Sequence, residues 1–200
     1  MKKSHATLAI SSLAAVAAFA VAGQVRGSQE SAHGASPDWT ISISGGHETE
    51  GVDRGRPVNL VAGGLGVKPE VFREAFSHVH PAPAGQRPDE QRVHMNKQAL
   101  LSALQPYGIT NEQLDTVSNY YRYRREQGEM WPTAEATAVA ILKKGALTSI
   151  KIDKGGSGYN SVPTVTIAGH PEIKLKAVLL YGKDLKNNGS ISEIQIVKNL

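Results

Sequence analysis

The sequence predicts an α+β protein, with an N-terminal helical module of two helix hairpins followed by a small antiparallel β-sheet module. Residues 58–123 repeat apolar side chains at helical spacing, whereas residues 133–200 alternate or run apolar as strands do. The charged residues change at the same place. Residues 24–142 hold 11 basic side chains, nine of them Arg, whereas residues 143–200 hold nine, all Lys. We therefore expect a domain boundary near Pro132.

Residues 1–23 predict a secretory signal peptide. Two lysines precede an alanine-rich apolar stretch at residues 6–22, which is shorter than the roughly 18 apolar residues that a membrane span needs. Small residues at its end fit a cleavage site between Val21 and Gln24. A retained membrane anchor is the alternative. We expect an exported protein, periplasmic or extracellular, with no membrane span after signal cleavage.

Composition narrows the possible partners. The chain contains no cysteine, so disulfides and a lipid attached to a cleavage-site cysteine are both excluded. Without the two lysines of the signal peptide, 20 basic and 18 acidic side chains remain, which is a net charge of +2. This balance gives little support for nucleic acid as a partner.

Residues 24–52 predict a flexible leader with a possible strand. Ser, Gly, Ala and Gln dominate the first part of the leader, without apolar periodicity. Trp39, Ile41 and Ile43 then alternate with polar residues, as in a half-buried strand. Because one strand is not stable alone, we expect it to join a sheet elsewhere.

Residues 53–132 predict the helical module. Its first hairpin, at residues 58–76, has a turn at Gly66 and a second helix that begins with a proline at its first turn. Its second hairpin, at residues 95–123, repeats this plan. There, Thr110 and the glutamine three residues later predict a capping box at the start of the last helix.

Residues 133–200 predict the antiparallel β-module. The pattern is typical of a single meander, with hairpin turns at Lys144–Gly145 and Asn188–Gly189. The strands are expected at residues 136–142, 148–152, 163–167, 173–181 and 190–197.

An internal repeat lies within this β-module. Residues 138–153 return in modified form at residues 177–197. The copies are offset by 39 residues at their first alanines and by 44 at their second strands, so five residues are inserted in the second hairpin loop. We expect this loop, residues 183–188, to be expendable for the fold.

Between the copies, a strand is followed by GGSGY and then PTVTI. This pattern resembles a repeat of bacterial surface and phage-tail proteins, where it is a structural building block. Residues 53–132, with GVKPEVFREAF, PYGITNEQLDTVSNYYRY and EMWP, are similar to uncharacterised secreted bacterial proteins that carry this helical part before one GGSGY unit. The resemblance implies an architecture and assigns no catalytic residue.

The first candidate site is a cluster that interleaves aromatic rings with guanidinium groups at a helix end. Such a surface can stack on sugar rings or bases and can pair with anionic groups. For an exported protein, an anionic envelope polysaccharide is the favoured ligand. Packing of the rings in the core or at a domain interface is the alternative. The cluster comprises Tyr120, Tyr121, Arg122, Tyr123, Arg124 and Arg125.

The second candidate site is a histidine cluster. His78 and His80 are two residues apart, so in an extended segment both imidazoles face one side, and His94 could supply a third metal ligand. Three histidines would leave an open coordination position for one transition-metal ion. Solvated loop histidines are the alternative.

The third candidate is an acidic loop with Glu48, Glu50 and Asp53, whose oxygens suit Ca²⁺. The spacing is not that of a known calcium loop, so a solvated charged loop is the alternative. No nucleophile elbow, zinc-protease motif or phosphate-binding loop is present in the sequence.

These observations favour an exported, non-enzymatic binding or structural protein of the cell envelope or extracellular space, without a cofactor. Its expected partner is an envelope polysaccharide or a surface protein. The alternative is a metal-binding protein or metal-dependent enzyme that uses the histidine cluster.

Overall fold

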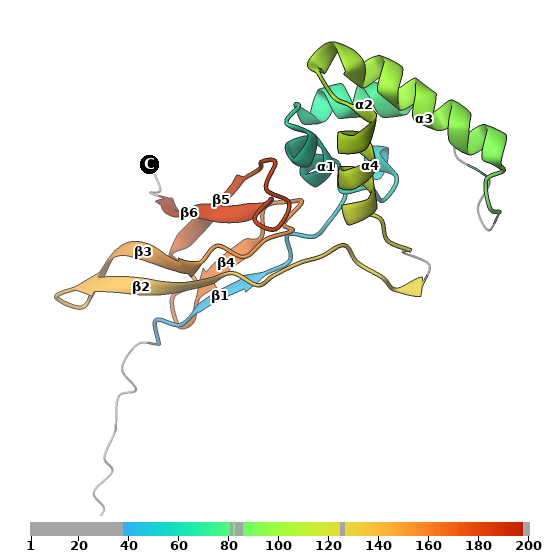
Figure 1. The fold of residues 1–200 in the computed structure, drawn as a ribbon. Coiled ribbons are helices and arrows are strands. Elements are labelled where there is room, and N and C mark those ends of the chain that lie inside the picture. Colours follow the sequence, from blue (N-terminus) through green and yellow to red (C-terminus); the bar gives the residue numbers. More distant parts are fainter. Residues whose placement is uncertain (1–37, 81, 83–85, 125–126, 198–200) are drawn as a thin grey trace, which may run out of the picture. The chain divides into compact units, whose positions relative to one another are not determined.

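The chain folds into helices and antiparallel strands, which confirms the predicted α+β class (Figure 1). The computed structural model describes residues 38–80, 82, 86–124 and 127–197. The predicted signal peptide, much of the leader and Arg125 lie outside the described residues. The helices are η1 (Gly51–Asp53), α1 (Val58–Leu65), α2 (Pro69–Ser77), α3 (Glu90–Leu104), η2 (Gln105–Tyr107) and α4 (Asn111–Tyr120).

Helix boundaries follow local capping chemistry. The predicted capping box opens α4: Thr110 Oγ1 accepts from the Gln113 backbone N–H at 3.2 Å, and Gln113 Oε1 accepts from the Thr110 N–H at 2.9 Å. Asp89 caps α3 by accepting from the Arg92 N–H at 2.7 Å. Gly66 ends α1 in the left-handed conformation, at φ +76°.

The arrangement of the helices as two similar hairpins is not confirmed. Helix α1 contacts both α2 and α4, whereas α3 contacts α2. Helix α3 begins at Glu90 rather than near Met95, and the separate turn η2 lies between it and α4. The helices therefore pack around α1 and α2 rather than as two independent pairs.

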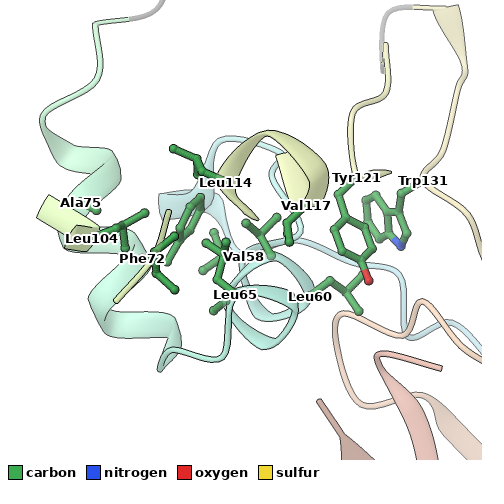
Figure 2. Packing of buried hydrophobic residues seen from close by; sticks show 13 residues of the cluster. Val58, Leu60, Leu65, Phe72, Ala75, Leu104, Leu114, Val117, Tyr121 and Trp131 are labelled. Carbon is green, nitrogen blue, oxygen red and sulfur yellow. The ribbon is translucent and has the colours of Figure 1, made fainter. Parts of the chain in front are cut away.

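Buried apolar side chains of the helices form one cluster (Figure 2). Val58 and Leu65 of α1, Phe72 of α2, and Leu114 and Val117 of α4 point towards one another. Each is at most 4% exposed. Burial of one such side chain contributes about 1.5–3 kcal/mol, so this cluster holds the helices together.

The strands form three two-stranded sheets, β1–β4, β2–β3 and β5–β6, and not the predicted single meander. Register shifts interrupt both hairpins, and such bulges bend strands away from a continuous ladder. The predicted leader strand does join a sheet, because Ile41 pairs with Ile167. The strands are β1 (Ile41–Ser44), β2 (Thr137–Lys143), β3 (Ala146–Lys154), β4 (Thr164–Ile167), β5 (Lys174–Leu180) and β6 (Ser190–Val197).

The GGSGY segment, residues 155–159, contacts both Trp131 and the strands. Gly158 has φ +80°, and its carbonyl accepts from Trp131 Nε1 at 2.8 Å. Tyr159 packs back on the strands, as its 4% exposure shows, within a second apolar cluster. The buried members of this second cluster are Tyr159, Val165, Ala177, Ile191 and Ile194.

The loop between β5 and β6, residues 181–189, connects the β-hairpin to the helices, so the prediction that residues 183–188 are expendable is wrong. Asn188 is 1% exposed. Its Nδ2 donates to the Leu60 carbonyl of α1 at 2.7 Å and to the Tyr121 hydroxyl at 2.8 Å, and its Oδ1 accepts from the Gly182 N–H at 3.0 Å. The loop therefore carries a contact on which both parts depend.

Two glycines in α1 make this contact possible. A Cβ at Gly63 would lie 2.8 Å from Asn188 Oδ1, and one at Gly64 would lie 2.8 Å from Leu185 Cδ2. Glycine lowers helix propensity by about 1 kcal/mol relative to alanine. The close approach of the loop explains why α1 nevertheless contains two glycines.

Candidate functional site

A cavity of about 250 Å³ lies beside η1, the start of α1 and the end of α2. Arg54, Arg56 and Arg73 line it together with one carboxylate, Asp53, and we call it the arginine pocket. It is smaller than the roughly 300–1,000 Å³ of pockets for drug-sized ligands, so it suits one small group. The other lining residues are Val52, Val58, Phe76, Ser77 and Val79.

Asp53 and Arg73 form a bidentate pair in this pocket. Arg73 Nε donates to Asp53 Oδ1 at 2.7 Å, and Arg73 Nη2 donates to Asp53 Oδ2 at 3.0 Å. The Asp53 side chain is 2% exposed, and the hydrogen bonds it accepts raise the pKa of Arg73. Glu50 adds a second ion pair to Arg73, at 3.0 Å. Asp53 is therefore already neutralised by Arg73.

Arg56 is held by contacts that leave its charge uncompensated. Its Cζ lies 3.7 Å from the centre of the Phe76 ring, and its Nη1 donates to the Asp53 carbonyl at 3.3 Å. Burial lowers the pKa of Arg56, and the charge of Arg54 lowers it further. An arginine stays protonated in proteins, so Arg56 remains a partly desolvated cation.

Arg54 supplies the second uncompensated cation. Within the described residues, neither Arg54 nor Arg56 forms an ion pair with an Asp or Glu side chain. Arg54 has φ +50°, a backbone conformation that costs a non-glycine residue about 1–2 kcal/mol. Residues held in strained backbone conformations cluster at ligand and active sites, which makes this loop a candidate site.

The charges of this pocket suit an anion. Three positive charges face the two negative charges of Asp53 and Glu50, which leaves one in excess. Guanidinium groups match carboxylate, sulfate and phosphate oxygens with paired donors. The described residues that line the pocket include no histidine or cysteine.

Sequence reasoning missed this pocket. The residues Asp53, Arg54, Gly55 and Arg56 follow one another, and we interpreted the segment through its carboxylates alone. The alternation of two arginines around a glycine was a local signal that could have been used. Nothing local indicated Arg73, which α2 brings to Asp53 from 20 residues away.

The predicted aromatic–arginine cluster is not one surface in the structure. Tyr121 is 4% exposed and accepts a hydrogen bond from Asn188, and Tyr120 packs partly buried against the helical cluster. Tyr123 donates its hydroxyl to the Gly55 carbonyl, between the two unpaired arginines of the pocket. These rings therefore pack within the protein, which was the alternative to ligand binding. Tyr123 positions the loop that carries Arg54 and Arg56.

The arginines of the predicted cluster also have different environments. Arg122 is exposed, whereas Arg124 forms an ion pair with Glu129 at 2.5 Å and donates its backbone N–H to the same carboxylate at 2.9 Å. Arg125 lies outside the described residues. Of the two arginines that the structure describes here, Arg124 therefore serves at least partly to hold the segment between α4 and Trp131.

The three predicted metal ligands are exposed and are not brought together. His78 lies 3.5 Å from Glu74 of the same helix turn, and the backbone of His80 is held by the side chain of Asn96 at 2.9 Å. His94 lies on α3. Within the described residues, no group of three or more His, Asp or Glu side chains could hold one metal ion.

The acidic loop is also not a calcium site in its geometry. Asp53 and Glu50 pair with Arg73, while Glu48 accepts from the Ser161 hydroxyl and from the Gly46 N–H. The hydrogen bond from Ser161 lowers the pKa of Glu48. The three carboxylates thus have separate protein partners.

In the part of the chain that the structure describes, no helix is long and apolar enough to cross a membrane. Comparison of the chain with protein-family models, with curated proteins and with solved structures found no match. Its function must therefore be inferred from the chemistry of the arginine pocket.

Proposed function

We propose that the protein is an exported, non-enzymatic binding protein whose arginine pocket takes a carboxylate group of an anionic envelope polysaccharide. The observation that carries this proposal is the pair of unpaired guanidinium groups, Arg54 and Arg56, at a cavity where Asp53 is already neutralised. A small pocket with one excess positive charge suits a single carboxylate on a longer chain. Exposed Val52, at 72%, provides apolar surface beside it for a sugar ring.

The ligand class follows from pocket size and from the predicted location. A uronate residue presents one carboxylate on a ring, and a polymer can leave its remaining rings outside the cavity. Arginine recognises such a planar, two-oxygen group better than lysine does. Export itself rests on the sequence of residues 1–23, and the mass of the protein recovered from an envelope fraction should place its first residue between Val21 and Gln24.

The test is retention on immobilised polygalacturonate, together with calorimetric titration of the same polymer. Arg54→Gly combined with Arg56→Gln should reduce the affinity at least tenfold, because each charge-assisted contact contributes about 1.5–3 kcal/mol. The matched control is Arg122→Gln, which removes an exposed guanidinium outside the pocket. Affinity that stays unchanged in the double variant, or falls equally in the control, would contradict the proposal.

Folding must be checked separately, since Arg56 packs on Phe76. The single variant Arg54→Gly keeps this contact and replaces a strained residue by the one best suited to positive φ. It should lose affinity while its melting temperature stays the same or rises. A loss of binding in this variant therefore cannot be explained by unfolding.

A further inference from the structure

The tip of the β2–β3 hairpin, residues 141–147, combines exposed apolar side chains with unpaired lysines. Six consecutive residues, 141–146, are exposed. Ile141 is 39% exposed and Leu142 is 41% exposed, although both belong to residue types that are usually buried. A Cβ added to Gly145 would meet no atom within 4 Å, so the turn faces open space at this position.

The charged side chains at the tip of this hairpin are all positive. Residues 136–152 contain three lysines and no Asp or Glu. Lys151 pairs with Asp153 at 3.1 Å, near the base of the hairpin. Within the described residues, Lys143 and Lys144 at the tip form no ion pair.

The turn holds a lysine, Lys144, in a backbone conformation that is unfavourable for this residue type. Lys144 has φ +54° and precedes Gly145 at φ +78°, which is the conformation of a tight hairpin turn. Asparagine or glycine suits the first of these positions, whereas lysine costs about 1–2 kcal/mol. Such a cost at an exposed turn is explained when the side chain has a role outside the fold.

We propose that this hairpin tip docks on an anionic phospholipid surface, with Ile141 and Leu142 inserted among the lipid headgroups and Lys143 and Lys144 paired with lipid phosphates. A mixture of apolar and basic side chains is the composition that binds at a membrane interface without crossing it. Each lysine near an anionic surface contributes about 1 kcal/mol, and the two half-exposed aliphatic side chains add to this. The tip lies outside the arginine pocket, so this proposal does not depend on the proposed function.

The first experiment is co-sedimentation of the full chain with vesicles of phosphatidylcholine, with and without phosphatidylglycerol. Lys143→Glu with Lys144→Glu should lower the partition coefficient on the anionic vesicles at least about 30-fold, the factor that corresponds to about 1 kcal/mol for each of two lysines. The matched control makes the same charge change on exposed residues of β5, as Lys174→Glu with Lys176→Glu. Equal loss in both double variants would overturn docking by the tip.

The second experiment uses the absence of cysteine to place one probe at the tip. Leu142→Cys, labelled with an environment-sensitive fluorophore, should gain intensity and shift to shorter wavelength on anionic vesicles. Val162→Cys, at a 56% exposed position outside the hairpin, should not respond. No response at Leu142→Cys would overturn the proposal. The proposal would also be overturned if the unmodified chain bound no vesicles but self-associated, and if Leu142→Ser abolished that self-association.

The two proposals fail independently. Arg54→Gly should leave vesicle binding unchanged, and the tip variants should leave polygalacturonate affinity unchanged. Vesicle binding that disappears in Arg54→Gly would assign the lipid contact to the arginine pocket and would overturn docking by the tip.

Discussion

The two long β-hairpins have related sequences and opposite environments at their ends. Hairpin β2–β3 closes with the two-residue turn Lys144–Gly145 and leaves residues 141–146 exposed. Hairpin β5–β6 closes with the loop at residues 181–189, whose Asn188 is among the least exposed residues of the protein. The five inserted residues thus distinguish a free end from an end that holds the helices.

This difference shows where polar groups stabilise the fold. At the β5–β6 end, one asparagine makes buried hydrogen bonds to a helix carbonyl and a tyrosine hydroxyl, and a part-buried one from a loop amide. At the β2–β3 end, polar and apolar groups alike face solvent. Changes at the first end should therefore affect stability, and changes at the second should affect binding.

The largest expected effect is that of Asn188→Ala. Its loss leaves the Leu60 carbonyl, the Tyr121 hydroxyl and the Gly182 amide without this partner, which we expect to lower the free energy of unfolding by about 4 kcal/mol. Urea unfolding would measure it. The control is Asn187→Ala, which removes a hydrogen bond between exposed side chains and should cost below about 1 kcal/mol. Similar losses in both variants would contradict this view of the loop.

A pair of glycines gives the sharpest comparison of the two ends. A Cβ at Gly189 would lie 2.4 Å from Leu60 Cδ2 and 2.6 Å from the Tyr159 carbonyl oxygen, whereas a Cβ at Gly145 meets nothing within 4 Å. Both have positive φ, +70° and +78°. We expect Gly189→Ala to cost about 3 kcal/mol, from overpacking and strain, and Gly145→Ala about 1 kcal/mol, from strain alone. Equal costs would show that the contact at Gly189 is unimportant.

Alkaline pH should destabilise the fold through two tyrosines at the β5–β6 end. Burial raises the pKa of Tyr121 and of Tyr181 to about 12. In the unfolded chain both lose their protons near about pH 10, so between these pH values the unfolded state binds fewer protons and stability falls as pH rises.

Urea midpoints measured from neutral pH to about pH 11 would test this expectation. Tyr121→Phe should flatten the alkaline decline, whereas Tyr107→Phe, at a 56% exposed position, should not change it. A decline that is identical in the two variants would contradict the assigned cause.

The smallest expected effect lies at the exposed turn. Lys144→Gly relieves a left-handed lysine and should raise the free energy of unfolding by up to about 1 kcal/mol, while it weakens binding to anionic vesicles. Thermal unfolding and co-sedimentation of the same preparation measure both quantities. A variant that is less stable, or that binds vesicles as before, would contradict the interpretation of this residue.

Local patterns were sufficient to predict much of the fold. The α+β class, the Thr110 capping box, the turn at Gly66 and the strand near Ile41 all depend on neighbours within a few residues, and the structure confirms them. The single meander was wrong because a strand pattern does not specify which strands pair or where bulges occur.

The candidate site was less predictable for a related reason. The pairing of Asp53 with Arg73 and the burial of Asn188 against Leu60 both depend on contacts between distant parts of the chain. A sequence shows charged and aromatic residues, but not which of them are neutralised or buried. Tyr121 illustrates this, since its ring is buried although it lies in a sequence that suggested an exposed binding surface.

The most direct test of the central claim is a titration of the protein with glucuronate, followed by NMR through the ¹⁵N signals of the arginine Nε groups. We expect the signals of Arg54 and Arg56 to shift together with one dissociation constant, while the signal of Arg122 stays in place. Shifts that are confined to Arg122, or that are absent from both pocket arginines at saturating glucuronate, would contradict the assignment of anion binding to this pocket.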